Sequence, residues 1–473
     1  MFDHQASSYW YSRWLFERGL AAIYLIAFLV AANQFIPLAG ERGLLPAVRF
    51  VREVPFRYSP SLFYWWTSDQ AFRVGAWAGV ALSLVALLGI AARFGAVPAA
   101  IVWGALYLLY LSFINVGQTW YGFGWESLLV EAGFFTIFAG AASTAPSTLL
   151  NWIYRWTLFR LMFGAGLIKL RGDACWRQLT CLDYFFETQP MPNGLSWYLH
   201  HLPKQLLHGG VAFNHFVELI VPFGFFLPQP YAGIAGLFTI AFQLILIAGG
   251  NLSWLNWLTI VLAFTTLDDR FLRWLPVSIP PLHAMGVVQK GATVALVCVV
   301  GLLSVAPTMN MLSSRQVMNT SFNPLQIVNT YGAFGSVTKE RYEIVIEGTS
   351  DETVTDKTIW REYEFEGKPG DPARRPPQIA PYHLRLDWLM WFAAMATPSD
   401  YPWFSELLAK LLQGDPRVLG LLAVNPFPDR PPTWIRAQLY LYRFTTPDER
   451  RQSGRWWHRQ PVAEYFPAVR LRP

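Results

Sequence analysis

Long apolar stretches follow one another through the first two thirds of the chain. A helix that crosses the hydrocarbon core of a bilayer needs about 20 mostly apolar residues. Six stretches have this character with almost no charge, at residues 19–38, 74–92, 96–115, 233–249, 286–305 and, the shortest, 252–267. Three further apolar stretches contain ionisable residues, at 125–142, 152–170 and 211–227. The pattern therefore predicts about nine membrane spans.

The pattern changes after the last apolar stretch. Residues 341–348 alternate, with Ile344 and Ile346 on one face and Glu343 and Glu347 on the other, which is typical of a half-buried strand. Strands are also predicted at 359–365 and 433–444, and helices at 386–395 and 403–412. The predicted fold class is a polytopic α-helical membrane domain, residues 1–315, followed by a mainly β (α+β) soluble domain, residues 316–473.

The distribution of charge supports this division. Charged residues make up 14% of the chain, against about 25% in soluble globular domains. Residues 1–315 hold 31 of the 68 acidic and basic residues, and the shorter remainder holds 37. This composition excludes a purely soluble enzyme, a disordered chain and a disulfide-rich secreted module. The net charge of +6 is not concentrated in any basic run, so nucleic acid is not an expected partner.

The ionisable residues inside predicted spans are informative. A charge at the centre of a bilayer costs at least ~3 kcal/mol, so such residues face the bundle interior and find partners. We expect Arg160 to pair with Glu131 or Glu126, and Glu218 to form a polar helix face with neighbouring amide and imidazole groups. Such pairs either hold the bundle together or take part in function. The intramembrane set is Glu126, Glu131, Arg155, Arg160, Lys169, His215 and Glu218, with Asn214 beside the last two.

A second group of candidates lies in the loop after the span at 152–170. The loop is rich in large aromatic and charged side chains, which favours an ordered segment over disorder. Such a segment either forms a binding surface with the C-terminal domain or only caps the bundle against water. The Pro-rich segment 368–377 displays two arginines that we expect to pair with the loop's carboxylates. The candidate surface comprises Asp173, Cys175, Trp176, Arg177, Asp183, Tyr184, Glu187, Gln189, His200, His201, Arg374 and Arg375.

The cysteines leave two possibilities open. Cys175 and Cys181 form a disulfide if the loop faces an oxidising compartment. On one continuous helix, however, their Cα atoms would be about 9 Å apart and could not be bridged, so two free thiols are the alternative. Cys298, in the last apolar stretch, is expected to be a buried free thiol.

No metal or cofactor site is expected. His201, His208 and His215 at helical spacing would lie about 10 Å apart per step, too far for one ion. The sequence contains no nucleophile elbow, Walker loop, dinucleotide fingerprint, HExxH or CxxC. We therefore assign no catalytic residues.

Several long motifs resemble the lipase maturation factor family. In the helical part these are ERGLAAIYLIAF, GLLPA, GWESLLVEAGF and FRLMFGAGLIKLRGDACWRQLTCLDYFFETQPMPNGLSWYLHHLP. In the C-terminal part they are NTYGAFGSVTKERYEIVIEG, KPGDPARRPPQIAPYHLRLDWLMWFAA and NPFPDRPPTWIRAQLYLYRF. The resemblance covers nearly the whole chain.

The resemblance implies a membrane-embedded maturation factor whose client is a secreted lipase or similar hydrolase. In animals the family acts in the endoplasmic reticulum, with its C-terminal domain lumenal; a bacterial member would lie in the plasma (inner) membrane. An odd number of spans with a cytoplasmic N-terminus would place the loop at 175–203 on the same side as the C-terminal domain.

Two alternatives belong to other functional classes. The spans are distantly similar to the membrane half of vitamin K-dependent carboxylase-like proteins, where Lys169, His200, His201, His215 and Glu218 could supply acid and base groups. A transporter would be favoured by inverted repeats, and the sequence contains none that we can detect.

Overall fold

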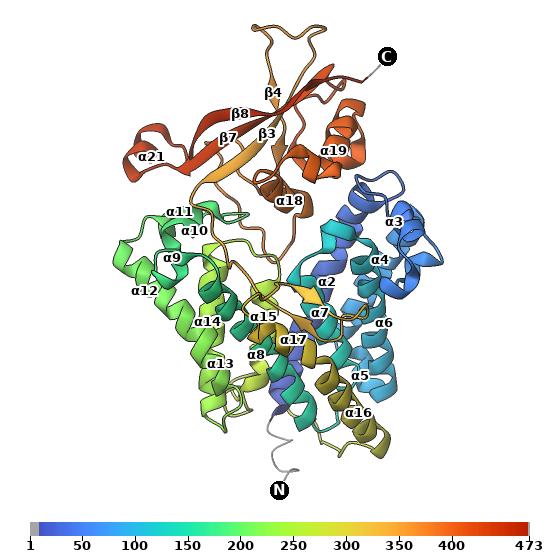
Figure 1. Cartoon of the computed structure of the whole chain (residues 1–473). Coiled ribbons are helices and arrows are strands. Elements are labelled where there is room, and N and C mark those ends of the chain that lie inside the picture. Colours follow the sequence, from blue (N-terminus) through green and yellow to red (C-terminus); the bar gives the residue numbers. More distant parts are fainter. Residues whose placement is uncertain (1–8, 472–473) are drawn as a thin grey trace.

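A bundle of helices carries a sheet-containing domain at one end (Figure 1). The structure is a computed structural model and describes residues 9–471. It confirms the predicted fold class, a helical membrane domain followed by an α+β domain. The helices of the first part are α2 (Trp10–Ala39), α3 (Ala47–Glu53), α4 (Asp69–Leu87), α5 (Ile90–Phe94), α6 (Ala96–Val116), α7 (Gly124–Thr136), α8 (Thr148–Arg171), α9 (Ala174–Arg177), α10 (Leu182–Thr188), α11 (Ser196–His200), α12 (Lys204–His215), α13 (Val221–Gly224), α14 (Tyr231–Gly249), α15 (Leu255–Ala263), α16 (Val287–Leu303) and α17 (Val305–Leu312).

Six helical segments of residues 9–471 are long and apolar enough to cross a membrane. They are Trp10–Ala39, Asp69–Leu87, Ala96–Val116, Lys204–Gly224, Tyr231–Gly249 and Val287–Leu312. The three other predicted spans are helical as well but differ in character. α7 and α15 are short and largely buried, and α8 has 24 residues but carries several charges. A short, mainly apolar helix is stable here because other protein segments surround it, and the two glutamates of α7 are buried in ion pairs.

The start of α2 and the C-terminal domain lie at opposite ends of the bundle (Figure 1). At one end, Trp10 Nε1 donates to the Ala142 carbonyl (3.2 Å), and the Trp10 N–H donates to Asp269 (3.2 Å). At the other end of the same helix, Gln34 Nε2 donates to the carbonyl of His383 in the C-terminal domain (2.7 Å). α2 therefore runs from one end of the bundle to the end that carries the C-terminal domain.

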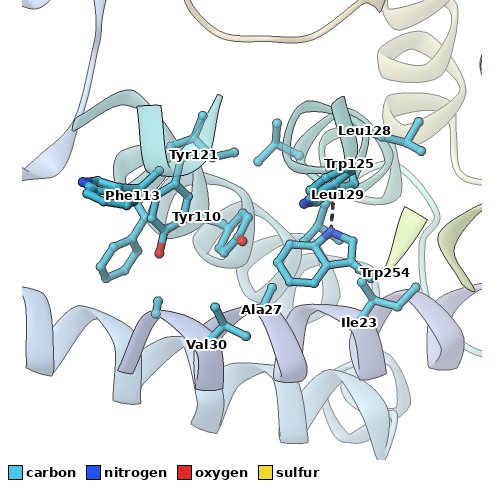
Figure 2. Packing of buried hydrophobic residues seen from close by; sticks show 14 of the residues in the cluster. Ile23, Ala27, Val30, Tyr110, Phe113, Tyr121, Trp125, Leu128, Leu129 and Trp254 are labelled. Carbon is cyan, nitrogen blue, oxygen red and sulfur yellow. Dashed lines mark hydrogen bonds between the residues drawn. The ribbon is translucent and has the colours of Figure 1, made fainter. Parts of the chain in front are cut away.

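Aromatic side chains dominate the packing around α2 (Figure 2). Tyr110 of α6 packs edge-on to Phe28 with ring centroids 5.2 Å apart, and Trp254 Nε1 donates to the Trp125 carbonyl (3.1 Å). α2 and α4 approach so closely that a Cβ on Gly79 would lie 2.2 Å from the Phe28 ring. Glycine at this position therefore permits the contact between the two helices.

The C-terminal domain is built on a four-stranded antiparallel sheet of order β4-β3-β7-β8. The predicted strand at 433–444 and both predicted helices are present. The predicted strand at 359–365 is broken into β4 and β5, which have two residues each. The elements are β3 (Arg341–Thr349), β4 (Arg361–Glu362), β5 (Glu364–Phe365), α18 (Arg385–Ala393), α19 (Pro402–Gln413), α20 (Pro416–Leu419), β6 (Leu422–Val424), β7 (Trp434–Phe444), α21 (Pro447–Ser453) and β8 (Trp457–Val469).

β3 differs from the half-buried strand that its alternation predicts. Ile344 and Ile346 are buried as expected, but Glu343 on the opposite face is also fully buried. Its carboxylate pairs with Arg341 (2.5 Å) and Lys368 (2.9 Å). The polar positions of this central strand therefore face other protein segments instead of water, because their charges are neutralised inside the domain.

The segment between α17 and β3 returns to the helical bundle. It contains the two-residue strands β1 (Thr320–Ser321) and β2 (Asn329–Thr330), which pair antiparallel. Tyr107 Oη of α6 donates to the Leu325 carbonyl (2.7 Å). Residues 316–338 are thus part of the packing of the helices.

Candidate functional site

The predicted intramembrane partner of Arg160 is Glu131, and the structure confirms this pair. Both side chains are at least 98% buried. The other carboxylate oxygen of Glu131 accepts hydrogen bonds from the Asn329 N–H (2.9 Å) and Tyr331 Oη (2.6 Å). The ion pair thus joins α7 and α8 to the segment at 316–338. Sequence reasoning missed Asn329 and Tyr331, although both lie in the quoted NTYGAFG motif.

Glu126 pairs instead with the C-terminal domain. Its Oε1 lies 2.8 Å from Arg385 Nη1, and both side chains are fully buried. Tyr110 Oη donates to the other oxygen of Glu126 (2.5 Å), and the Arg385 guanidinium lies over the Tyr121 ring (3.5 Å). This contact fastens the C-terminal domain to the bundle. The signal for Arg385 in the sequence is an arginine inside the mainly apolar segment LRLDWLMW, which also contains Asp387.

Lys169 of α8 pairs with Glu218 across the helices. Asn214 donates to the second oxygen of Glu218 (2.8 Å), as the i, i+4 spacing predicts. His215 does not join this group, because its Nε2 lies 2.9 Å from the Trp176 carbonyl. The helix contains a π-helical turn at Phe216–Ile220. This turn changes the directions in which side chains before it point relative to side chains after it.

Arg155 has carbonyl oxygens as partners. Its Nε donates to Thr265 (3.0 Å) and its Nη1 donates to Phe225 (3.1 Å). Backbone carbonyls at helix ends are common partners for buried cations. Arg155 therefore ties α8 to the ends of two neighbouring helical segments.

Cys175 and Cys181 form a disulfide. The objection from helical spacing does not apply, because the chain turns between α9 and α10 and Leu179 adopts a positive φ of 61°. The two Cα atoms are 4.7 Å apart. Cys298 is a free thiol, but it is exposed on α16 instead of buried as predicted. In a membrane, this outward face of the helix contacts lipid.

The first part of the loop is anchored by contacts to its neighbours. Trp176 is buried, and its Nε1 donates to the Phe334 carbonyl (2.8 Å). Asp173 accepts from the Val337 N–H (2.8 Å). Arg177 is exposed and donates to the Gly172 carbonyl (2.9 Å) at the end of α8. These contacts make this part of the loop rigid.

The carboxylate of Asp183 lies near two groups of α12. Lys204 Nζ is 3.5 Å away and His208 Nε2 is 3.6 Å away. Tyr184 lies beneath Lys339, whose Nζ is 5.8 Å from the ring centroid. Both residues remain near the surface of the loop.

The loop contacts the sheet directly at a junction formed by Glu187–Pro190, Arg341 and Phe444. Arg341 Nη1 donates to the carbonyls of Glu187 (3.0 Å) and Gln189 (2.5 Å), and Nη2 donates to Pro190 (3.0 Å). The Phe444 N–H donates to the Glu187 carboxylate (2.6 Å). A fully buried arginine at the start of β3, which sequence reasoning missed, therefore organises this junction.

The predicted pairing of Arg374 and Arg375 with the loop's carboxylates is wrong. Arg374 donates to carbonyls of its own segment, including Phe365 (2.7 Å) and Lys368 (3.1 Å). Arg375 is exposed and lies 5.6 Å from the Trp456 ring centroid. The Pro-rich segment folds back on itself, so Arg374 satisfies the carbonyls that the prolines leave without local donors.

His200 and His201 lie beside the junction but bind separate groups. His201 Nδ1 is 2.7 Å from the Trp197 carbonyl, and His200 Nε2 is 3.8 Å from Glu187. Burial, followed by the neighbouring His201, lowers the pKa of His200 to about 4, and burial raises the pKa of Glu187. At neutral pH His200 is therefore uncharged, and this contact is not an ion pair.

A cavity of about 390 Å³ lies between the bundle, the loop and the C-terminal domain. Its wall includes Lys169, Glu218 and Asn214 together with apolar and aromatic side chains from α8, α10, α14, α15 and α18. Of the acid and base candidates named from the sequence, only Lys169 and Glu218 reach it. Lys169 and Glu218, two titratable groups of the spans, thus line this cavity together.

Comparison with known proteins identifies the family. Residues 11–274 match the lipase maturation factor transmembrane domain, and residues 327–467 match the lipase maturation factor C-terminal domain. The chain belongs to the lipase maturation factor family. Lipase maturation factor 1 of Mus musculus is 45% identical, with 98% of this chain and 88% of the relative covered. Lipase maturation factor 2 of Gallus gallus is 31% identical, with 97% and 81% covered. No solved structure matches the chain.

The two family domains meet at the contacts described above. Arg385, Asn329 and Arg341 all lie in the lipase maturation factor C-terminal domain, and their partners Glu126, Arg160 and the 187–190 carbonyls lie in the transmembrane domain. This member of the lipase maturation factor family is therefore a multi-pass membrane protein whose two domains are joined by buried polar contacts.

Alkylation should distinguish the three cysteines of this lipase maturation factor homologue. Without reductant we expect an apolar maleimide to label Cys298, because it is exposed, and to leave Cys175 and Cys181 unmodified. Mass spectrometry of the intact denatured protein measures the number of labels. Denaturation after reduction serves as the control and should add two more. Labelling of Cys175 or Cys181 without reductant would contradict the disulfide.

The pH dependence of stability should report on His200. In the unfolded chain its pKa is near 6.5 and in the folded chain it is about 4, so the unfolded state binds the extra proton between these values. Stability is therefore highest above pH 6.5 and falls as pH decreases toward 4, by on the order of 2–3 kcal/mol from this group. Burial raises the pKa of Glu187, so protonation of this group favours the folded state as pH falls. This contribution is the same in the wild type and in a His200 variant.

The matched variant is His200→Gln, which keeps the side chain polar but cannot be protonated. The apparent melting temperature in detergent, measured at several values of pH, should fall less steeply between 6.5 and 4 in the variant. Identical slopes for the two proteins would show that His200 does not titrate in this way.

Proposed function

We propose that this protein assists the folding and assembly of secreted lipases or similar hydrolases from within a membrane. The relatives that it matches over almost its whole length are named lipase maturation factor 1 and 2. The observation that carries the proposal is the junction, which joins the disulfide-closed loop to the C-terminal sheet at the end of the bundle opposite the start of α2. A rigid surface of this kind suits transient contact with a client protein.

We propose that this surface faces a non-cytoplasmic compartment. Disulfides persist in oxidising compartments, which supports placing the loop and the C-terminal domain on that side. In a eukaryotic host the membrane is then that of the endoplasmic reticulum, and in a bacterial host it is the plasma (inner) membrane.

The test is secretion of active client. A secreted lipase is co-expressed with this protein in cells that lack their own maturation factor, and lipase activity per amount of secreted lipase is measured. We expect Tyr198→Ala and Arg375→Ala to lower this ratio several-fold while leaving the abundance of this protein unchanged. Tyr198 is 47% exposed on α11, and exposed aromatic and arginine side chains contribute strongly to binding.

Trp274→Ala is the matched control. Trp274 is 74% exposed and belongs to the loop that contacts α2 near its first residues, through Asp269 and Val277. An equal loss of activity in this control, or a loss in the test variants that only follows their own abundance, would contradict a client-binding surface. Trp176 is unsuitable for this test because it is buried.

One observation favours a second candidate function, a membrane enzyme distantly related to vitamin K-dependent carboxylase-like proteins. Lys169 and Glu218 line one cavity, as acid and base groups of an enzyme would. An enzyme of this kind loses activity completely when both are replaced by Met. A folding factor that acts through the junction keeps measurable client maturation in the same variant.

A further inference from the structure

The cavity between the two domains has the size and lining of a small-molecule site. Its volume of about 390 Å³ lies within the range of ~300–1,000 Å³ typical of ligand pockets. Leu161 and Met162 of α8, Leu246 of α14, Leu255 of α15 and Phe185 of α10 form apolar walls. A hydrocarbon chain fits such walls because it needs no hydrogen bonds.

One end of the cavity is polar and neutral overall. The ammonium of Lys169 is paired with Glu218, so the two charges cancel. Within residues 9–471 its hydrogen bonds go to Glu218 and, at 3.4 Å, to Asn214, whereas an ammonium has three N–H donors. A third donor therefore remains for an acceptor oxygen on a bound molecule.

A second buried donor on the wall is weakly satisfied. Gln243 is 4% exposed, and its Nε2 has the Met162 sulfur as acceptor at 3.6 Å. A thioether sulfur is a weak acceptor. Lys169 and Gln243 can thus each donate a hydrogen bond to an oxygen atom of a ligand. A charged ligand is not favoured, because burying an unpaired charge is costly.

The mouth of the cavity is lined by flexible apolar side chains. Met318 is 43% exposed and Met395 is 44% exposed, and both line the cavity beside Trp391. Methionine adapts to ligands of different shape. These residues lie where the segment at 316–338 and the end of α18 meet the helical bundle, and their exposure leaves this part of the cavity open to a ligand.

We propose that this cavity binds one molecule of an uncharged lipid. Its hydrocarbon chain occupies the apolar part, and a hydroxyl or carbonyl oxygen of its head accepts a hydrogen bond from Lys169. A polypeptide segment fits less well, because each of its backbone N–H and C=O groups needs a partner and most of the cavity surface is apolar. The inference is independent of the lipase client.

The test uses photoreactive lipids and the purified full-length protein. A monoacylglycerol with a diazirine in its chain is added in detergent, irradiated and located by mass spectrometry of peptides. We expect adducts on cavity residues such as Met162 and Leu246, and we expect excess unlabelled monoolein to remove them. Adducts confined to outward-facing residues such as Leu237 and Val288, which are exposed, would overturn the proposal.

Two alanine substitutions give a matched pair. Ala165 lines the cavity, whereas Ala81 is exposed on α4. Ala165→Phe should reduce the cavity adducts several-fold, and Ala81→Phe should leave them unchanged. Equal labelling of the two folded variants would overturn the assignment, and the monoolein competition decides the question if Ala165→Phe does not fold.

The nature of the head is tested with a second probe. A fatty acid with the same photoreactive chain is anionic at neutral pH, and we expect it to label the cavity several-fold less than the monoacylglycerol does. In the double variant Lys169→Met/Glu218→Met the monoacylglycerol should label the cavity less, because the Lys169 donor is gone, and the fatty acid should still label it weakly, because an unpaired charge in an apolar cavity is costly. Stronger labelling by the fatty acid would overturn the uncharged head, and displacement of the probe by an apolar client peptide but not by monoolein would assign the cavity to a polypeptide.

Discussion

Replacing Arg385 by Met is expected to lower the free energy of unfolding by about 3–5 kcal/mol and to loosen the C-terminal domain from the bundle. Removing one partner of a buried ion pair has this cost because the other charge is left buried and unpaired. Here the partner is Glu126, 2.8 Å away and fully buried. The variant also loses the hydrogen bond to the Trp120 carbonyl (2.5 Å) and the contact with the Tyr121 ring.

The measurements are the apparent melting temperature in detergent and the rate of limited proteolysis between the two domains. Both should change markedly in Arg385→Met. Arg417 provides a control because it also joins the C-terminal domain to the bundle, through Asp69 at 3.1 Å, but its side chain is 39% exposed. Exposed ion pairs contribute ~0–1 kcal/mol, so Arg417→Met should change little.

Equal effects of the two variants would contradict the role assigned to Arg385. If both are mild, other contacts hold the domains together. If both are severe, the boundary is sensitive to any loss of charge, and burial does not distinguish the two arginines.

The positions of the helices could be predicted from the sequence, because each apolar stretch has a clear length. All nine predicted segments are helical. Their surroundings could not be predicted in the same way. α7 and α15 read as spans because they lie in mainly apolar stretches, but whether lipid or protein covers such a helix depends on tertiary packing, which periodicity does not report.

The candidate site shows the same limit for charged groups. Because a charge in the membrane is costly, Arg160 is predicted to have a carboxylate partner. The acidic residues of the preceding apolar stretch are Glu126 and Glu131. The partner of the remaining glutamate is Arg385, more than 250 residues later. Pairing over such a separation depends on how the two domains dock, and nothing local in either segment encodes it.

The predicted partners of the loop after α8 differ from the observed ones for physical reasons. Arg374 is used by carbonyls of its own Pro-rich segment, because prolines lack the N–H groups that would otherwise satisfy nearby acceptors. Nothing in the sequence around Arg341 marks it as a contact of the loop, yet it binds the carbonyls of Glu187, Gln189 and Pro190. Which arginine contacts the loop thus depends on where backbone carbonyls of the loop lie, as well as on where its carboxylates lie.

A second large effect is expected at the centre of the bundle. Replacing Arg160 by Met should lower the free energy of unfolding by about 3–5 kcal/mol and reduce the yield of folded protein. Glu131 would keep its hydrogen bonds from Asn329 and Tyr331 but would lose its cation. The monomer peak in size-exclusion chromatography and the apparent melting temperature measure the loss.

Arg171→Met is the control on the same helix. Arg171 is exposed at the end of α8 and donates to the Met311 carbonyl (2.8 Å) and to Gln316 (2.6 Å), so its replacement should cost far less. If Arg160→Met and Arg171→Met behave alike, position within the bundle does not govern the effect.

The double variant Glu131→Gln/Arg160→Met separates the two sources of the cost. If the unpaired carboxylate dominates, removing its charge should recover part of the lost stability, since buried pairs can often be replaced by neutral groups with little penalty. If the double variant is no better than Arg160→Met alone, the cost comes from the hydrogen bond that Arg160 gives to the Asn329 carbonyl. The segment at 316–338 would then be the element that Arg160 stabilises, and the charge of Glu131 would be secondary.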